Sequence, residues 1–221
     1  LATIEKRTTG DASVDNYFQT ARYADEAIKQ FFEQLEASGL ADNTMIVMYG
    51  DHYGISDNHN EAMSEVLSKD ITPVENAKLQ RVPLFIHVPG MEGGINDTYG
   101  GQIALLPTVM HLLGVETQNY VHFGTDLLSE EHEELVMFRN GDYVSPDVYS
   151  IGEAFYDPET GLPLEEQQLE QAETLKQHGR YELQLSDQVV NGDLLRFYTP
   201  NGFTPVDPSD YYYQQSTDLT E

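Results

Sequence analysis

The sequence contains no cysteine, so two kinds of site are excluded from the start. A disulfide framework and a thiolate metal site both need cysteine sulfur. Basic residues are also scarce: 11 Lys and Arg stand against 38 Asp and Glu, which gives a net charge of -27. A chain this acidic is not expected to present a general surface for nucleic acid or for an anionic membrane. We interpret most of the acidic charge as solvated surface.

Long apolar runs are absent as well. No run approaches the roughly 20 apolar residues that a membrane span needs, and no basic segment followed by an apolar one opens the chain. The first residue is Leu1 rather than Met, and we therefore expect a processed product or a fragment that has lost any targeting segment. The 221 residues are 39% hydrophobic, which is enough for a sizeable core.

Apolar periodicity predicts the elements of the first half. Between residues 15 and 38, apolar side chains recur every three or four positions, which predicts an amphipathic helix that begins at Asp15 as N-cap and ends at Gly39. The segments 44–50 and 81–90 are short and continuously apolar, as is typical of strands buried on both faces. A short helix is predicted between them. The order helix, strand, helix, strand indicates an α/β fold with a mostly parallel sheet covered by helices.

The pattern changes after about residue 128. The Asn-Gly pair at 140–141 lies between two strand-like runs, which is a strong signal for a β-hairpin. Residues 164–197 are rich in helix-forming residues, with Gly179 and the segment 191–193 as expected interruptions. These patterns predict a small carboxyl-terminal subdomain over 129–221, built from an antiparallel sheet and helix.

The first apolar strand ends on a cluster of polar residues, "GDHYGISDNHN". In open α/β sheets, ligands bind outside the carboxyl ends of the strands, and Asp51 and His52 occupy that place. An ionised aspartate and a neutral imidazole are both good ligands for Zn²⁺ or Mn²⁺. Gly50 and Gly54 let the backbone turn so that the two adjacent side chains can converge on one ion. The alternative is that Asp51 caps a loop and that His52 is an ordinary loop residue.

A third candidate is His59, which follows in the same cluster and could fold back over the site as a substrate contact. The alternative for His59 is a cap for the helix that begins near Asn60. His87 and His111 lie inside apolar segments, and we interpret both as core histidines rather than as ligands.

Several other catalytic motifs are missing from the sequence. It contains no Gly-rich phosphate loop, no nucleophile elbow and no Cys–His pair. A bound dication could polarise a phosphoryl group, but it cannot by itself supply a nucleophile.

The order of segments resembles a known family. The stretch "YFQTARYADEAIKQFFEQLEASGLADNTMIVMYGDHYGISDNHNEAM" is followed by "LQRVPLFIHVPG", "LPTVMHLLGV", "FRNGDYVSP" and "NGDLLRFY". Together these closely resemble the carboxyl-terminal part of the extracellular domain of bacterial lipoteichoic acid synthases, phosphoglycerol transferases of the sulfatase and alkaline phosphatase superfamily. The motif "GDHYGIS" followed by "NHN" is much narrower than the "GDHG" of the superfamily.

The resemblance implies a chemistry for the cluster. Enzymes of this family hold one Mn²⁺, use a Thr nucleophile and move glycerol phosphate from phosphatidylglycerol onto a growing polymer. Asp51 and His52 match the metal ligands of the family motif, although the ligands alone leave Zn²⁺ and Mg²⁺ open. The Thr nucleophile, the acidic ligand and the residues that grip glycerol phosphate lie upstream of the matched region in the family. Residues 1–128 would then be the second half of a sulfatase-like catalytic domain, inactive alone.

The same resemblance implies partners and a location. The partners would be phosphatidylglycerol, the glycerol phosphate polymer and the upstream half of the domain, whose transmembrane helices would tether it. The location would be the extracellular face of the bacterial cell membrane, or the cell wall and medium after cleavage. Two alternatives stay open: a phosphodiesterase or sulfatase of the same superfamily, and a non-catalytic module that binds cell-wall proteins. Fold likeness does not separate them, because function depends on the site.

Overall fold

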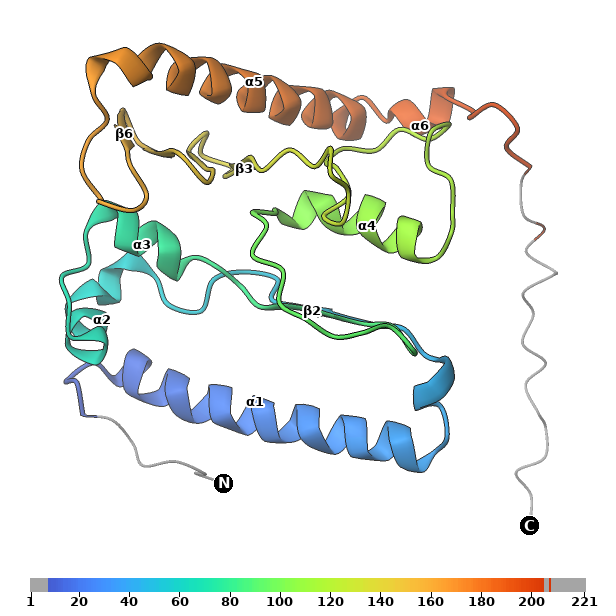
Figure 1. Ribbon diagram of the computed structural model, residues 1–221, viewed down its shortest axis with the longest axis horizontal. Coiled ribbons are helices and arrows are strands. Elements are labelled where there is room, and N and C mark those ends of the chain that lie inside the picture. Colours follow the sequence, from blue (N-terminus) through green and yellow to red (C-terminus); the bar gives the residue numbers. More distant parts are fainter. Residues whose placement is uncertain (1–7, 205–206, 208–221) are drawn as a thin grey trace. The chain divides into compact units, whose positions relative to one another are not determined.

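The computed structural model describes residues 8–204 and 207 (Figure 1). The chain divides into two compact units. The first unit consists of Leu1–Tyr99 and Glu134–Gly179, and the second consists of Gly100–Glu133 and Arg180–Glu221. These units reflect packing within this chain, so the boundary near residue 128 that the sequence pattern indicates stays a prediction.

The first unit opens with the long helix α1, Ala12–Ala37, followed by the short 3-10 helix η1, Ala41–Asn43. The amphipathic helix predicted from the periodicity is confirmed, but it begins earlier than expected. Asp11, not Asp15, is the N-cap, because its carboxylate accepts the backbone N–H groups of Ser13 and Val14. Gly39 ends the helix as predicted, with a φ of +71° that a residue with a side chain rarely adopts.

The two apolar segments form the strands β1, Ile46–Tyr49, and β2, Leu84–His87. They pair antiparallel, with Ile46 opposite His87 and Tyr49 opposite Leu84, so the prediction of a parallel sheet is wrong for this pair. The reason lies in the connection between them. The Gly50 N–H donates to the Pro83 carbonyl over 3.0 Å, so the chain leaves β1 and enters β2 at the same end. The connecting helices therefore close a loop at one end of the strands and do not cross the sheet.

That connection contains η2, Asp57–His59, then α2, Asn60–Leu67, and α3, Pro73–Leu79. Together with Val14 and Phe18 of α1, its apolar side chains build a small core. The members from the connection are Ile55, Ala62, Met63, Val66, Ile71 and Leu79. This core packs the start of α1 against the segment that follows Asp51 and His52. The position of the candidate site in the fold therefore depends on it.

The predicted small antiparallel sheet is confirmed. Four short strands pair in sequence order: β3, Val136–Met137; β4, Tyr143–Val144; β5, Tyr149–Ile151; and β6, Ala154–Tyr156. Tyr143 is fully buried against helix α5, Glu166–Asn191, and its hydroxyl donates to the Ala172 carbonyl over 3.0 Å. Burial raises the pKa of the Tyr143 phenol to about 12, so it stays a neutral donor.

One predicted interruption of the helical region is wrong and the other is confirmed. α5 runs through Gly179 without a break. A Cβ at this position would overlap the sulfur of Met137, so Gly179 is a close-packing position rather than a helix end. α5 ends at Asn191, and the four-residue helix α6, Leu194–Phe197, follows after the predicted break.

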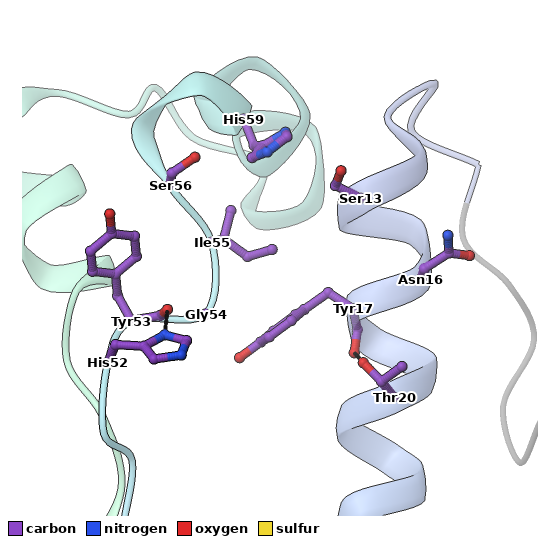
Figure 2. Close-up of a pocket in the computed structure, with 10 residues that line it drawn as sticks. All are labelled: Ser13, Asn16, Tyr17, Thr20, His52, Tyr53, Gly54, Ile55, Ser56 and His59. Carbon is purple, nitrogen blue, oxygen red and sulfur yellow. Dashed lines mark hydrogen bonds between the residues drawn. The ribbon is translucent and has the colours of Figure 1, made fainter.

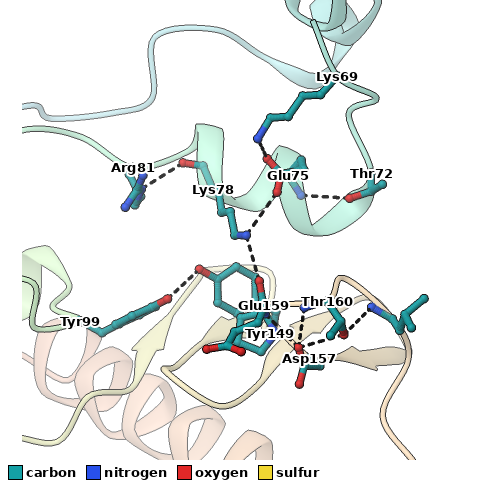
Figure 3. Close-up of polar contacts among 12 residues, drawn as sticks. Lys69, Thr72, Glu75, Lys78, Arg81, Tyr99, Tyr149, Asp157, Glu159 and Thr160 are labelled. Atoms are coloured by element: carbon teal, nitrogen blue, oxygen red, sulfur yellow. Dashed lines mark hydrogen bonds and ion pairs between the residues drawn. The ribbon is translucent and has the colours of Figure 1, made fainter. Parts of the chain in front are cut away.

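Helix α3 is linked to the turn that follows β6 by a polar cluster (Figure 3). The Lys78 ammonium donates to the Pro158 carbonyl over 2.9 Å and pairs with the Glu75 carboxylate at 3.2 Å. Glu75 also pairs with Lys69. The contacts with Lys69 and then Lys78 hold the pKa of Glu75 below its usual value. The small antiparallel sheet is thereby connected to the segment between β1 and β2.

The second unit contains η3, Gln102–Ala104, and α4, Leu105–Leu112. Thr108 of α4 is fully buried, and its hydroxyl donates to the Ala104 carbonyl and accepts the N–H of Leu127. Among the described residues, no helix combines the length and the apolar character that crossing a membrane requires.

Candidate functional site

A pocket of about 540 Å³ lies beside the predicted metal ligands, between the first turns of α1 and the segment after β1 (Figure 2). Its lining is polar and aromatic and includes no carboxylate, although the whole chain is strongly acidic. The lining residues are Ser13, Asn16, Tyr17, Thr20, His52, Tyr53, Gly54, Ile55, Ser56 and His59.

Asp51 and His52 follow β1 directly, as the sequence predicts. Their side chains are 87% and 76% exposed, and the Asp51 Oδ1 and His52 Nε2 atoms are 3.6 Å apart. Gly50 contributes to this placement, because a Cβ there would lie only 2.7 Å from the Cβ of Val82. The end of β1 can thus lie close to the start of β2 and present the next two side chains to solvent.

One backbone carbonyl determines which nitrogen of His52 is available. The His52 Nδ1 atom lies 2.8 Å from the Tyr53 carbonyl oxygen (Figure 2). A carbonyl oxygen can only accept, so Nδ1 carries the proton in this contact. The lone pair of the neutral ring is then on Nε2, the atom that faces Asp51. This is the arrangement in which a metal-ligating histidine donates its other N–H to a backbone carbonyl.

The separation of these two atoms fits a shared metal ion. Two ligands that lie about 2.1 Å from an ion in a tetrahedral arrangement are about 3.4 Å apart. The measured 3.6 Å between Asp51 Oδ1 and His52 Nε2 is close to that value. No group of three or more His, Asp or Glu side chains suited to a metal ion occurs in the part of the chain that the structure describes. Asp51 and His52 would therefore be two ligands of an ion whose other ligands come from water or from elsewhere.

His59 lines the same pocket but is connected to α1. Its Nδ1 atom lies 2.5 Å from the second carboxylate oxygen of Asp11, and the two side chains are 27% and 26% exposed. The hydrogen bond from His59, together with the N–H groups at the start of α1, lowers the pKa of Asp11. His59 occupies the N-cap position of α2, as the capping alternative expects, but its side chain makes no capping hydrogen bond to that helix. Its role as a substrate contact stays a prediction.

The α1 wall of the pocket was not anticipated from the sequence. Its members Ser13, Asn16, Tyr17 and Thr20 are spaced three, four and seven positions from the first, so they share one helix face. That spacing is the signal that could have found them. Figure 2 shows the Tyr17 ring extending from α1 toward the segment at Gly54. A Cβ on Gly54 would overlap this ring, so glycine is required for the contact.

The two histidines that we interpreted as core residues are exposed instead. His87 is exposed on β2, and the side chain of His111 is 61% exposed. His111 pairs through Nδ1 with the Asp126 carboxylate. An apolar neighbourhood in the sequence therefore did not mean burial in this chain.

Comparison with known proteins places the chain in a family. Residues 2–115 match the family described as Sulfatase. The chain is 52% identical over 218 residues to "Lipoteichoic acid synthase 1" of Bacillus subtilis (strain 168), which covers 99% of this chain and 34% of that protein. It is 53% identical over 205 residues to "Lipoteichoic acid synthase 2" of the same strain, covering 92% and 31% of the two chains.

The likeness extends to a second genus. The chain is 46% identical over 213 residues to "Lipoteichoic acid synthase" of Staphylococcus aureus (strain USA300), covering 96% of this chain and 33% of that protein. The chain thus spans about a third of the length of these curated relatives. The resemblance inferred from the sequence motifs is confirmed. Since the family match covers just over half of its residues, the chain belongs to the sulfatase family.

Proposed function

We propose that this chain carries part of the catalytic site of a Mn²⁺-dependent glycerol phosphate transferase that builds lipoteichoic acid from phosphatidylglycerol. The observation that carries the proposal is the Asp51–His52 pair: two ligand atoms 3.6 Å apart after a strand end, with His52 Nε2 as the available nitrogen. Support for the polymer comes from the relatives, which are named lipoteichoic acid synthases.

Each residue of the pair has a separate task. Asp51 supplies an anionic oxygen, and His52 supplies a neutral nitrogen that the Tyr53 carbonyl keeps in one tautomer. Mn²⁺ is the proposed ion, and Zn²⁺ and Mg²⁺ are alternatives for the same two ligands. When bound, the ion would neutralise charge on a phosphoryl oxygen and help to activate an attacking hydroxyl. The lining of the pocket beside the pair offers hydroxyl, amide and imidazole groups that could donate hydrogen bonds to the oxygens of an anionic substrate.

The Thr nucleophile is proposed to belong to the part of a longer protein that corresponds to the upstream half of the domain. The β1–β2 sheet supports this, because within residues 8–204 neither strand pairs with a third one and several of its apolar side chains are exposed. Tyr49 is 50% exposed, Leu84 38% and Phe85 63%. Further residues of a complete sulfatase domain would cover them. We therefore propose that the 221-residue chain alone has no transferase activity.

The proposed setting follows from the proposed substrates. Phosphatidylglycerol is a membrane lipid, so the active enzyme would work at the extracellular face of the bacterial membrane, tethered by helices upstream of this chain. The growing glycerol phosphate polymer would be its second partner. Release to the cell wall or medium after cleavage is part of the same proposal.

A chimera tests this function without requiring the chain to act alone. The region of B. subtilis lipoteichoic acid synthase 1 that aligns with this chain is replaced by this chain. Polymer formation from phosphatidylglycerol is then measured beside release of free glycerol phosphate. We expect polymer from the chimera, loss of polymer in Asp51→Asn, and full activity in the control His87→Gln.

Two other outcomes would overturn the proposal in favour of the alternatives. Release of glycerol phosphate without polymer would identify a phosphodiesterase. Full polymer formation by the Asp51→Asn chimera would show that the pair does not serve catalysis, as expected for a non-catalytic binding module.

A further inference from the structure

We propose that His59 is a positioning residue: through its contact with Asp11 it ties the end of the metal-ligand loop, residues 51–59, to the start of α1. This inference rests on the proposed function only for the identity of the ligands. It assigns to His59 a task that differs from metal ligation, and it explains why a histidine follows the metal motif at this distance.

Asp11 uses both of its carboxylate oxygens as hydrogen-bond acceptors. One oxygen accepts the N–H groups of Ser13 and Val14 at 2.8 and 3.2 Å and so caps α1. The other accepts from His59 Nδ1 at 2.5 Å, across 48 positions of sequence. A carboxylate fixed by two helix N–H groups has little freedom to move, so it is a rigid attachment point for the ring.

The metal-ligand loop, residues 51–59, also contacts α1 at other points on the same side. The Tyr17 ring packs against Gly54 with no space for a Cβ between them. Ile55 packs on the small core that contains Val14 and Met63. His59 completes this series at the place where the loop passes into α2. The loop that begins with Asp51 and His52 is therefore fixed at its middle and its end.

The nitrogen that His59 uses distinguishes a positioning role from metal ligation. The nitrogen of His59 that contacts Asp11 is Nδ1, so this nitrogen is engaged within the protein. Asparagine places its amide N–H close to where a histidine Nδ1–H lies, whereas glutamine reaches the region of Nε2. If Nδ1 is the working atom, His59→Asn should preserve the contact, and both His59→Gln and His59→Ala should lose it.

The experiment uses the 221-residue chain labelled with ¹⁵N at histidine. Two quantities are measured for each variant: the ¹⁵N shifts of the His52 ring, which report its tautomer, and the dissociation constant for Mn²⁺ by calorimetry. The variants are His59→Ala, His59→Gln, His59→Asn and Asp11→Ser. Serine caps a helix about as well as aspartate but is too short to reach His59. Asp157→Ser is the control, because Asp157 also accepts backbone N–H groups, but in a turn after β6.

We expect His59→Ala, His59→Gln and Asp11→Ser to shift His52 toward the tautomer mixture of a free side chain and to weaken Mn²⁺ binding about tenfold, the loss of one charged hydrogen bond. His59→Asn and the control should resemble the unmodified chain. Circular dichroism verifies that each variant is folded, and the folded His59→Asn chain alone still discriminates between the two roles.

Three results would overturn the inference. One is an unchanged His52 tautomer in folded His59→Ala and Asp11→Ser. Another is a His59→Asn chain as defective as His59→Ala while Asp11→Ser is normal, because that pattern identifies His59 as a ligand. The third is an equal effect of the control. If the unmodified chain binds no Mn²⁺, the metal part of the proposed function fails, whereas the tautomer measurement still decides this inference.

Discussion

At the scale of single residues, the chemistry of the site depends on which atoms are already engaged by the protein. The Tyr53 carbonyl engages Nδ1 of His52 and leaves Nε2 beside Asp51. Asp11 engages Nδ1 of His59. Two histidines seven positions apart thus have different hydrogen-bond partners, although the sequence presents them in one cluster. The sequence could single out Asp51 and His52 as candidate ligands, because their place after an apolar strand is a local feature. It could not identify Asp11, because its partner lies 48 positions away.

The Asp11–His59 contact predicts a pH dependence with a definite sign. The hydrogen bond from His59 and the N–H groups of α1 lower the folded-state pKa of Asp11 below its usual value of 3.8. Ionised Asp11 therefore stabilises the folded chain above the unfolded-state pKa, and this stabilisation is lost as the pH falls through the lowered folded-state value.

Urea unfolding of the unmodified chain and of Asp11→Ser between about pH 6 and pH 2 measures this directly. The difference in unfolding free energy between the two should shrink as the pH falls below about 4. A difference that stays constant over the whole range would show that the carboxylate is not stabilised by the contact.

At the scale of the elements, close packing overrides local sequence signals. Glycine predicts a helix interruption at 179, yet α5 continues through this position, where the missing side chain leaves room for Met137. The strands β1 and β2 were identified from their apolar runs, but their relative direction depends on where the connecting helices return the chain. Local patterns therefore locate the elements, whereas contacts between distant segments decide their pairing.

Gly179→Ala tests the close packing of α5 against Met137 of β3. Alanine in a free helix position stabilises by about 0.5–1 kcal/mol relative to glycine, but overpacking at a filled site costs about 1–3 kcal/mol. We expect net destabilisation, measured by urea unfolding. The exposed position Gln184→Ala serves as the control and should change stability by less than about 0.5 kcal/mol. Stabilisation by Gly179→Ala would mean that Met137 does not occupy this space.

Lys78→Met tests the link between α3 and the turn after β6. The substitution removes the donor to the Pro158 carbonyl and leaves Glu75 with one lysine partner. We expect the free energy of unfolding, measured with urea, to fall by about 1 kcal/mol. The control Lys29→Met removes one partner of an ion pair within α1, whose two side chains are 63% and 60% exposed. It should lower the free energy of unfolding by at most about 0.5 kcal/mol. Equal effects of the two substitutions would contradict the structural role of Lys78.

At the scale of the whole molecule, the dominant features are the net charge and the share of its relatives' length that the chain covers. A net charge of -27 on 221 residues produces mutual repulsion within the folded chain. The chain also spans only about a third of its relatives' length, which agrees with apolar side chains left exposed on β1 and β2. Composition alone predicted the acidic surface, and the motif order predicted the family. Neither could predict which apolar side chains of the described residues are exposed.

The charge predicts how salt affects stability. Raising NaCl from about 0.02 M to 0.5 M shortens the screening length from about 20 Å to about 4 Å and weakens repulsion among the carboxylates. We expect the melting temperature to rise, as measured by circular dichroism at pH 7. A melting temperature that falls with salt would mean that ion pairs such as Lys78–Glu75 contribute more than the general repulsion does.

Anomalous diffraction would establish whether Asp51 and His52 hold a metal ion. Crystals of the chain grown with MnCl₂ would be measured on both sides of the manganese edge. We expect an anomalous peak within about 2.2 Å of an Asp51 oxygen and of His52 Nε2. A well-ordered loop with no peak, or a peak on His59 instead, would contradict it.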